Sequence, residues 1–230
     1  MGRVIITGPP RASLDEVDRL QQFGVATIHE AIGRVGLLDP RLRPIQTGVR
    51  VAGTAVTVKC WPGDNLMIHA AVEQCRPGDL LVVTTTSEST DGVFGELLAT
   101  SFQSRGVRGL VTTTGVRDTE ELRSMSFPVW SAAVSAQGTV KATAGSVNVP
   151  VAIGRTVVRP GDVVVADEDG IVLVPRRDTA VAIEAATARV AKEEQTRAAL
   201  AAGELGLDRY GLRSLLADLG VEYRKAAHDD

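Results

Sequence analysis

The sequence has few aromatic residues, few histidines and few cysteines. Aromatic side chains make up 3% of its 230 residues, although the hydrophobic fraction as a whole is 44%. A core of this composition is built from Val, Ala, Leu and Ile, which suits packed layers of helices and strands. Only three histidines are present, one of them near the end of the chain, so neither a zinc triad nor a Ser–His–Asp arrangement is well supported.

The two cysteines, Cys60 and Cys75, have no CxxC spacing and no further ligand candidates nearby. This pattern favours reduced thiols, with a disulfide or redox role as the alternative. A net charge of −3 gives no global basic field, so nucleic acid is not an expected partner. No run approaches the ~20 apolar residues of a membrane span, and residues 1–10 lack the apolar core of a signal peptide. The sequence therefore predicts a cytoplasmic protein that does not enter a membrane.

The hydrophobic pattern predicts a single α/β domain over residues 1–230, with residues 179–223 as a C-terminal helical extension. Ser13 and Glu16 have capping-box spacing at the start of a helix over 13–22. Further helices are predicted over 27–32, 67–74 (after a cap at Asp64 or Asn65), 95–104, 119–124, 179–202 and 208–223. Strands are predicted over 49–59, 80–84, 107–113, 127–130, 147–151, 157–158, 163–166 and 171–174.

Turn residues mark two further features. The phrase Arg-Pro-Gly-Asp occurs at 76–79 and at 159–162, each time before a buried strand. Pro at the second position and Gly at the third suit a type II turn, so local geometry explains the repeat without a duplicated domain. The turn Glu168-Asp169-Gly170 predicts a hairpin. The acidic run 167–169 is interpreted as the solvated tip of that hairpin in preference to a metal cluster.

Two segments in the middle of the chain have the composition of a small-acid site. Residues 92–100 are a glycine-flanked loop followed by an apolar helix, and the first N–H groups of a helix bind a carboxylate or phosphate. Residues 109–113 are an apolar strand, and a glycine turn at 114–115 then delivers Arg117 and Asp118. Asp118 suits a hard divalent cation, and Arg117 suits developing negative charge. One helix plus one strand separates the segments, which predicts that both border one crevice and favours a lyase acting on small acids.

Several of the polar residues also have a structural interpretation. Asp118 is a plausible N-cap for the helix that follows it. His29 and His69 lie on short predicted helices, where structural roles are favoured. Lys59 and Lys141 have the amine of a Schiff-base lysine, but neither has a cationic neighbour that would lower its pKa, so covalent catalysis is disfavoured.

A long colinear set of motifs resembles one enzyme family. The motifs are residues 26–31 (ATIHEA), 62–69 (PGDNLMIH), 91–101, 115–118 (GVRD), 137–142 (QGTVKA) and 202–206 (AGELG). Over residues 25–223 the chain resembles the 4-hydroxy-4-methyl-2-oxoglutarate / 4-carboxy-4-hydroxy-2-oxoadipate aldolases, the class II pyruvate aldolases of bacterial aromatic degradation.

The resemblance implies a fold, an assembly and a metal. The implied fold is a layered α/β/β/α sandwich, shared with the regulators of ribonuclease activity, and the family assembles as trimers or hexamers. Asp118 is implied to bind Mg²⁺ or Mn²⁺, with water as most of the other ligands. A glutamate of a neighbouring subunit, matching Glu193 or Glu194, is implied to orient water at the metal. The resemblance therefore predicts an active site shared between subunits.

The implied reaction is retro-aldol cleavage of a small oxo-acid substrate. The family cleaves 4-carboxy-4-hydroxy-2-oxoadipate, or 4-hydroxy-4-methyl-2-oxoglutarate, to pyruvate plus oxaloacetate or a second pyruvate. Decarboxylation of oxaloacetate is an expected side activity because it passes through the same pyruvate enolate. Arg117 is implied to contact the keto oxygen. The substrate carboxylate is implied to bind at the helix start, held by the N–H groups of Leu97 and Leu98, in the segment Gly95, Glu96, Leu97 and Leu98. No side chain is evident as the base for the 4-hydroxyl proton, so a metal-bound water is favoured.

Two alternative functions stay open. A non-catalytic, protein-binding regulator of ribonuclease activity has a similar fold but lacks the aspartate of the Arg–Asp pair. Arg117 and Asp118 are both present in this sequence, which favours the enzyme. A related oxo-acid lyase or decarboxylase would use the same residues on another acid, and the sequence does not separate that alternative from the aldolase.

Overall fold

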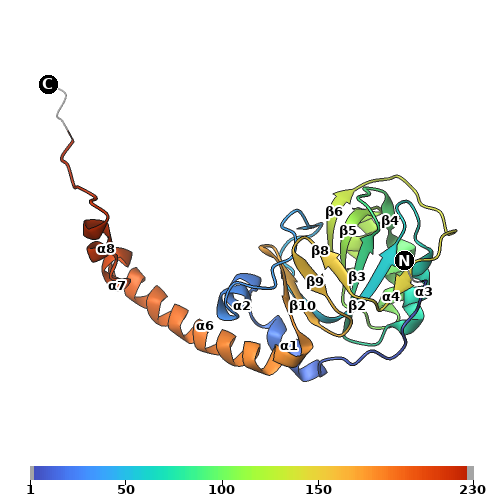
Figure 1. Cartoon of the computed structure of the whole chain (residues 1–230), viewed down its shortest axis with the longest axis horizontal. Coiled ribbons are helices and arrows are strands. Elements are labelled where there is room, and N and C mark those ends of the chain that lie inside the picture. The colour runs from blue at the N-terminus through green and yellow to red at the C-terminus, as the bar shows by residue number, and fades with distance from the viewer. Residues whose placement is uncertain (1–2, 227–230) are drawn as a thin grey trace. The chain divides into compact units, whose positions relative to one another are not determined.

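The computed structural model describes residues 3–226, and the chain divides into two compact units, Met1–Ala186 and Thr187–Asp230. The first unit is built around a mixed sheet with helices packed against it (Figure 1). The α/β class predicted from the sequence is thus confirmed. The prediction of a single domain over 1–230, with 179–223 as its extension, stays a prediction.

Within the described residues, nine strands form one sheet in the order β1-β6-β5-β3-β2-β10-β11, with β4 paired to β5 and β7 paired to β2. Neighbours from β6 to β2 are parallel, β10 is antiparallel to β2, and β11 is antiparallel to β10. A separate hairpin is formed by β8 and β9. The strands are β1 Arg43–Pro44, β2 Val51–Cys60, β3 Asp79–Thr85, β4 Gly92–Phe94, β5 Leu110–Val116, β6 Val129–Val134, β7 Ser146–Val147, β8 Val151–Ile153, β9 Thr156–Val158, β10 Val163–Asp167 and β11 Gly170–Val174.

Two groups of helices pack on the sheet through different apolar clusters. The helices are α1 Leu14–Gln21, α2 Val25–Ala31, α3 Leu66–Ala71, α4 Glu96–Gln103, α5 Thr119–Ser124 and α6 Thr179–Ala201. Ile68, Phe102 and Leu122 bury α3, α4 and α5 against the parallel strands. Leu20 and Ile28 bury α1 and α2 against β10 and β11, together with the start of α6. Figure 1 shows α1 and α2 on one side of the sheet and α3 and α4 on the other.

Alternate residues of a single strand face different clusters. In β3, Leu81 packs with α3, α4 and α5, whereas its neighbour Leu80 enters a central cluster with residues of β8 to β11. In β10, Val164 enters the same central cluster, whereas Val163 packs with α1 and α2. Side chains of a strand alternate between its faces, so this pattern shows that the sheet curls until β3 and β10 share one apolar interior.

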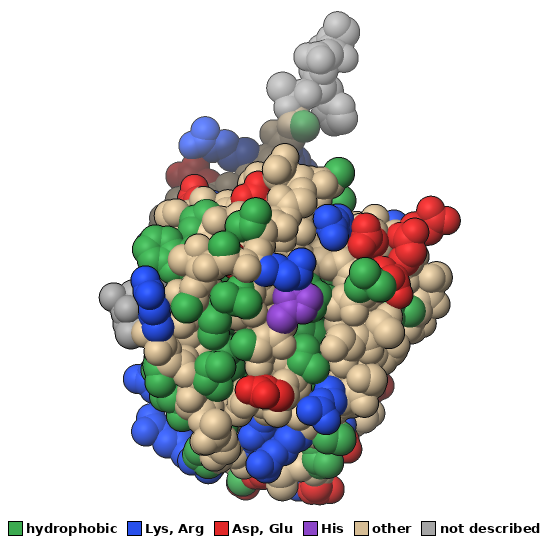
Figure 2. All heavy atoms as spheres, turned by 90° about the vertical axis from the view of Figure 1, so that its right-hand side faces the viewer, with side chains coloured by type: hydrophobic (Ala, Val, Ile, Leu, Met, Phe, Trp, Pro, Cys, Tyr) green, Lys and Arg blue, Asp and Glu red, His purple; other side chains and the backbone are tan. Residues whose placement is uncertain are grey.

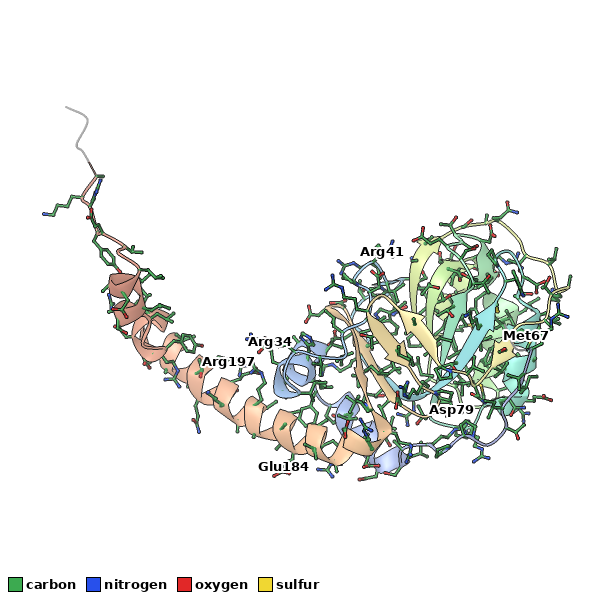
Figure 3. The ribbon with its side chains drawn as sticks, in the orientation of Figure 1. Arg34, Arg41, Met67, Asp79, Glu184 and Arg197 are labelled. Atoms are coloured by element: carbon green, nitrogen blue, oxygen red, sulfur yellow. The ribbon has the colours of Figure 1, made fainter. Side chains whose placement is uncertain are left out.

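Both Arg-Pro-Gly-Asp phrases form the predicted type II turns. Gly78 and Gly161 have φ values of 89° and 90°, as the third residue of such a turn requires. Asp79, labelled in Figure 3, is 1% exposed. Its carboxylate accepts hydrogen bonds from Arg11 Nε at 2.8 Å and from the N–H of Arg76 at 2.7 Å. The first turn therefore anchors the segment before α1 to the start of β3.

The hairpin at Glu168-Asp169-Gly170 is also confirmed, because Asp167 pairs with Gly170 across a two-residue loop. The Asp167 carboxylate accepts hydrogen bonds from the N–H of Val25 at 2.9 Å and of Asp169 at 3.0 Å. These bonds give the residue a structural role at the junction of β10 with α2.

One strand boundary that matters for function was predicted wrongly. β5 extends through Val116, so the expected glycine turn at 114–115 lies inside the strand. A Cβ on Gly115 would lie 2.1 Å from the carbonyl oxygen of Thr90. Gly115 thus allows the close approach of a neighbouring backbone rather than a turn, and Arg117 directly follows the strand.

The second unit contains the rest of α6, α7 Gly206–Arg209 and α8 Leu212–Asp218. The prediction of one helix over 208–223 was wrong, because Gly211, at φ 63°, separates the two short helices. Many apolar side chains of this unit are exposed, among them Val190, Leu200, Leu205, Tyr210, Leu215 and Leu219. Of the helices that the structure describes, none is long and apolar enough to cross a membrane.

Candidate active site

Two parallel strands end side by side, and each leads into a helix. Gly95 and α4 follow β4, while Arg117, Asp118 and α5 follow β5. A cavity of about 100 Å³ lies here, lined in part by the predicted site residues Gly95, Leu97, Leu98, Arg117 and Asp118. Ligands of open α/β sheets bind at the carboxyl ends of the strands. Figure 2 shows the side of the molecule that bears α3 and α4, where basic, histidine and apolar side chains gather.

Asp118 directs its carboxylate toward α4 rather than along α5. Its backbone is left-handed, with φ 56° and ψ 43°, and its side chain makes no capping hydrogen bond to α5. Oδ2 instead accepts a hydrogen bond from the N–H of Glu96 at 3.1 Å. A left-handed backbone is uncommon for a residue with a side chain. Asp118 therefore occupies the N-cap position of α5 without serving as its side-chain cap, and the carboxylate is left at the cavity.

The approach of that carboxylate requires glycine at position 95. A Cβ on Gly95 would lie 2.3 Å from Asp118 Oδ2 and 3.1 Å from Arg117 Cγ. The backbone of Gly95 is extended, a conformation open to any residue, so the constraint is space alone. The glycine recognised in the sequence before the helix thus allows close contact between the two halves of the site.

Arg117 directly follows β5 and lines the cavity. Its backbone N–H donates to the carbonyl of Phe94 at 2.9 Å, which joins it to β4. Its Nε is 3.8 Å from Asp118 Oδ2, and both side chains are more than 40% exposed. An exposed ion pair at this distance contributes little stability. The guanidinium is therefore well placed to meet an anionic ligand beside Asp118.

The start of α4 supplies two backbone donors. The first N–H groups of a helix have no acceptor inside it. Asp118 takes the N–H of Glu96, which leaves those of Leu97 and Leu98. The Glu96 side chain accepts a hydrogen bond from the hydroxyl of Thr100 at 2.9 Å, so Glu96 faces the site through its backbone. The structure thus brings the predicted segment 95–98 together with Arg117 and Asp118, while their roles stay predictions.

Four more residues line the same cavity and were not predicted as site residues: Asn65, His69, Val93 and Lys141. Burial lowers the pKa of His69, and the positive charge of Lys141 lowers it further. The expectation that Lys141 has no cationic neighbour was wrong, because Lys141 and Arg117 line one cavity. Asn65 and His69 are four residues apart at the start of α3, a helical spacing that places them on one face, and the motifs 62–69 and 137–142 of the family resemblance contain Asn65, His69 and Lys141.

Asp64 holds the segment that carries Lys141 beside the start of α3. It is 2% exposed, and Oδ2 accepts hydrogen bonds from the N–H groups of Ala142 at 2.8 Å and Thr143 at 2.7 Å. Oδ1 accepts one from the N–H of Leu66 at 2.8 Å. Burial opposes ionisation of Asp64, yet these backbone donors outweigh it and lower the pKa of the carboxyl. The ionised carboxylate therefore helps to assemble one wall of the cavity.

Replacing Asp64 with asparagine is expected to lower the free energy of unfolding at pH 7 by about 1.5–3 kcal/mol, the range for hydrogen bonds to a charged group. The lowered pKa stabilises the folded state above the unfolded value near 4, and this stabilisation is lost as the pH falls through the folded pKa. The gap between wild type and Asp64→Asn should therefore narrow below about pH 4. Urea unfolding of both proteins at pH 7 and pH 3 checks this prediction. A difference in the free energy of unfolding that stays constant with pH would refute it.

Glu193 and Glu194 lie on the part of α6 that belongs to the second unit. Glu193 Oε1 is 2.7 Å from Arg189 Nε, one helical turn away, and Glu194 pairs with Arg197. Both carboxylates are thus engaged with neighbours on their own helix. Their predicted role beside a metal stays a prediction.

The donor set suits a hard cation held mainly by water. Among the described residues, no group of three or more His, Cys, Asp or Glu side chains is placed to hold a metal ion. Mg²⁺ is usually bound through one or two carboxylates and keeps several waters. Asp118, with its side chain 41% exposed and beside a cavity, meets that requirement and suits Mg²⁺ or Mn²⁺.

Size alone does not select this cavity. A larger one of about 550 Å³ lies between residues 45–49 and 122–128, and Arg123 is its only charged lining residue. The smaller cavity has two basic side chains, a histidine, a carboxylate and a helix start around it. Convergent polar groups of this kind mark a binding site better than volume does.

A family model described as RraA-like, Aldolase/RraA, matches residues 25–173. The chain belongs to this RraA-like family. The matched range contains every residue that lines the 100 Å³ cavity. Within the RraA-like family, therefore, the cavity is part of the shared domain and the second unit lies outside the match.

Named relatives connect the RraA-like domain with aldolases and with ribonuclease inhibitors. A provisionally named 4-hydroxy-4-methyl-2-oxoglutarate aldolase of Halalkalibacterium halodurans is 24% identical over 200 residues, 87% of this chain and 95% of the relative. Its namesake from Burkholderia multivorans is 34% identical over 143 residues, 62% of this chain and 87% of the relative. Streptomyces coelicolor RraAS2, described as an unusual member of the RNase ES inhibitor RraA family, has a similar structure. Its TM-score is 0.73 at 29% identity, covering 83% of this chain and 99% of RraAS2.

Proposed function

We propose that this protein is a divalent-metal-dependent aldolase that cleaves 4-carboxy-4-hydroxy-2-oxoadipate, and 4-hydroxy-4-methyl-2-oxoglutarate, in bacterial aromatic degradation. The observation that carries the proposal is the contact between Asp118 and the first N–H of α4, with Arg117 beside it. A carboxylate, a guanidinium and a helix start then border one cavity. The names of the aldolase relatives support the same reaction class.

In this proposal each residue binds a different group of the substrate. The N–H groups of Leu97 and Leu98 hold the carboxylate next to the keto group, since a helix start favours an anion. Arg117 stabilises the negative charge that grows on the keto oxygen as the bond between C3 and C4 breaks. Asp118 would hold Mg²⁺ or Mn²⁺, which supplies a Lewis acid for the keto oxygen. Water takes the proton from the oxygen of the 4-hydroxyl group, and the C4–O bond becomes a carbonyl as the bond between C3 and C4 breaks. The electron pair of the broken bond enters the pyruvate enolate, and protonation at C3 gives pyruvate.

The same arrangement accounts for the proposed side activity. Oxaloacetate has the keto acid that Arg117 and the start of α4 would bind, and loss of CO₂ from it also leaves pyruvate enolate. Stabilising that enolate therefore accelerates both reactions. A related lyase acting on another oxo acid would use these residues unchanged.

A second candidate is inhibition of a ribonuclease, which the likeness to RraAS2 favours. Inhibition of a ribonuclease requires neither a metal ligand nor an oxyanion partner. In this protein, however, the left-handed backbone of Asp118 and the space left by Gly95 place a carboxylate at the cavity, where it could bind a metal. We therefore place the enzyme first.

The test is release of pyruvate by the purified protein from the two hydroxy acids and from oxaloacetate, with Mg²⁺ or Mn²⁺ present. The aldolase predicts rapid turnover of at least one hydroxy acid. Turnover of oxaloacetate alone would indicate a decarboxylase. No turnover of any of the three, with inhibition of an RNase E-type enzyme, would establish the regulator instead.

We also propose that the active site is shared between subunits of a trimer or hexamer, with Glu193, or else Glu194, orienting water near the metal. The length of α6, 23 residues, supports this proposal, since it corresponds to roughly 35 Å of helix. Mixing Asp118→Ala with Glu193→Ala, each inactive alone, should restore activity through hybrid sites. An active monomer, or no recovery after verified subunit exchange with either glutamate variant, would remove the proposal.

We further infer that the fold is the layered α/β/β/α sandwich. Three apolar clusters support this inference: one between α3–α5 and the parallel strands, one inside the curled sheet, and one between β10–β11 and the helices α1, α2 and α6.

A further inference from the structure

Asn65 is a buried amide at the wall of the cavity, and only one of its two side-chain polar atoms is hydrogen-bonded. It is 7% exposed, and its Nδ2 donates to the carbonyl of Val93 at 3.0 Å. Its backbone N–H donates to Val140 at 3.0 Å, and its carbonyl accepts from Ile68 at 3.1 Å. Asn65 therefore joins β4, the start of α3 and the segment that carries Lys141.

The side-chain oxygen of Asn65 has no partner among the described residues. A carbonyl oxygen cannot donate, and the amide nitrogen is the only donor of the Asn65 side chain. The bond to Val93 therefore fixes which end of the amide is nitrogen and leaves Oδ1 as the other. A buried polar atom without a partner is costly and calls for an explanation. Because Asn65 lines the cavity, a bound ligand that donates a hydrogen bond to Oδ1 would explain why this atom has no partner in the protein.

The other polar groups around the cavity narrow the choice of ligand group. Arg117, Lys141 and the free N–H groups of α4 are donors, and they suit carboxylate and keto oxygens. Such oxygens cannot donate to Oδ1. A hydroxyl group can, and an amide oxygen is a neutral acceptor that orients a hydroxyl without taking its proton.

We propose that Asn65 Oδ1 accepts a hydrogen bond from the 4-hydroxyl of the substrate, and so selects 4-hydroxy-2-oxo acids over oxaloacetate, which has no hydroxyl at that carbon. This proposal rests on the proposed aldolase function and adds the residue that recognises the hydroxyl. A site built to bond a hydroxyl discriminates strongly against an analogue that lacks it, since the buried partner is then left unpaired. Asn65 is thus a specificity-determining residue.

The test compares two activities of one variant. Asn65→Ala is expected to lower kcat/KM for 4-carboxy-4-hydroxy-2-oxoadipate by about 10–100-fold, the size of one or two hydrogen bonds to a bound substrate. Decarboxylation of oxaloacetate should change by less than about threefold. The affinity for oxalate, measured by calorimetry with Mg²⁺ present, should stay the same because oxalate has no hydroxyl. Asn65→Ser keeps a residue that is preferred at a helix N-cap. It should show the same contrast between the two activities as Asn65→Ala, with unchanged affinity for oxalate.

Asn148 offers a matched control. It is 1% exposed, its Nδ2 donates to the carbonyl of Ile6 at 2.8 Å, and its Oδ1 likewise has no partner among the described residues. It does not line the cavity. Asn148→Ala should therefore lower thermal stability and leave the ratio of the two activities unchanged.

Equal losses on both substrates in Asn65→Ala and Asn65→Ser, or weaker oxalate binding in step with them, would overturn the assignment and make Asn65 a structural residue. A changed activity ratio in Asn148→Ala would overturn it too. A wild-type protein that releases pyruvate from oxaloacetate but from no hydroxy acid would overturn the aldolase itself, and with it the role of Asn65.

Discussion

Replacing Asp118 with alanine is expected to lower kcat for pyruvate release by about 10³-fold or more while the protein stays folded. The proposed metal has a single carboxylate of the catalytic subunit to bind it, and a Lewis acid at the keto oxygen is worth several kcal/mol. The carboxylate is more than 40% exposed and its ion pair with Arg117 is long, so its loss should cost little stability. Activity is measured at saturating Mg²⁺ or Mn²⁺, and the fold by circular dichroism.

Asp118→Asn separates the two tasks of this side chain. An asparagine oxygen can still accept the hydrogen bond from the N–H of Glu96, but it lacks the charge that binds a hard cation. We expect Asp118→Asn to be nearly as inactive as Asp118→Ala. A variant with normal turnover would show that Asp118 orders the start of α4 and holds no metal.

Replacing Arg117 with lysine should lower kcat by about 10²–10³-fold, the loss seen when one donor to a developing oxyanion is removed. Lysine keeps the charge but not the planar fork of donors, so it should not restore the rate. KM should change much less than kcat, because the charge on the keto oxygen appears mainly in the transition state. Steady-state kinetics of Arg117→Lys and Arg117→Ala check this.

The opposite pattern would change the role of Arg117. A rise in KM with unchanged kcat in both variants would mean that Arg117 binds the ground state as strongly as the transition state. Gly92 and Gly138 lie beside Arg117, since a Cβ added at either glycine would be 3.3 Å or 3.4 Å from the arginine. This close packing would then position Arg117 for substrate binding alone.

The sequence predicted the parts of the site that are local in the chain. The segment 95–98 and the pair Arg117–Asp118 are visible because each follows an apolar strand at a glycine, and both are brought together as expected. The role of glycine 115 was misread because a glycine signals a turn and a close backbone approach equally well. Only the contact with Thr90 decides between them.

The remaining wall of the cavity could not be predicted in the same way. Lys141 reaches the site because the Asp64 carboxylate binds two N–H groups 78 and 79 residues further along the chain. Hydrogen bonds between distant segments leave no periodicity in the sequence. The N-cap interpretation of Asp118 shows the same limit, since its partner, Glu96, lies 22 residues earlier.

The most direct test of the account is pyruvate release from 4-carboxy-4-hydroxy-2-oxoadipate by metal-stripped protein, before and after metal is returned. Protein treated with EDTA and then freed of the chelator should be almost inactive. Adding Mg²⁺ or Mn²⁺ should restore full turnover to the wild type and none to Asp118→Ala. Turnover by the stripped wild-type protein at the untreated rate would contradict a metal-dependent aldolase with Asp118 as its ligand.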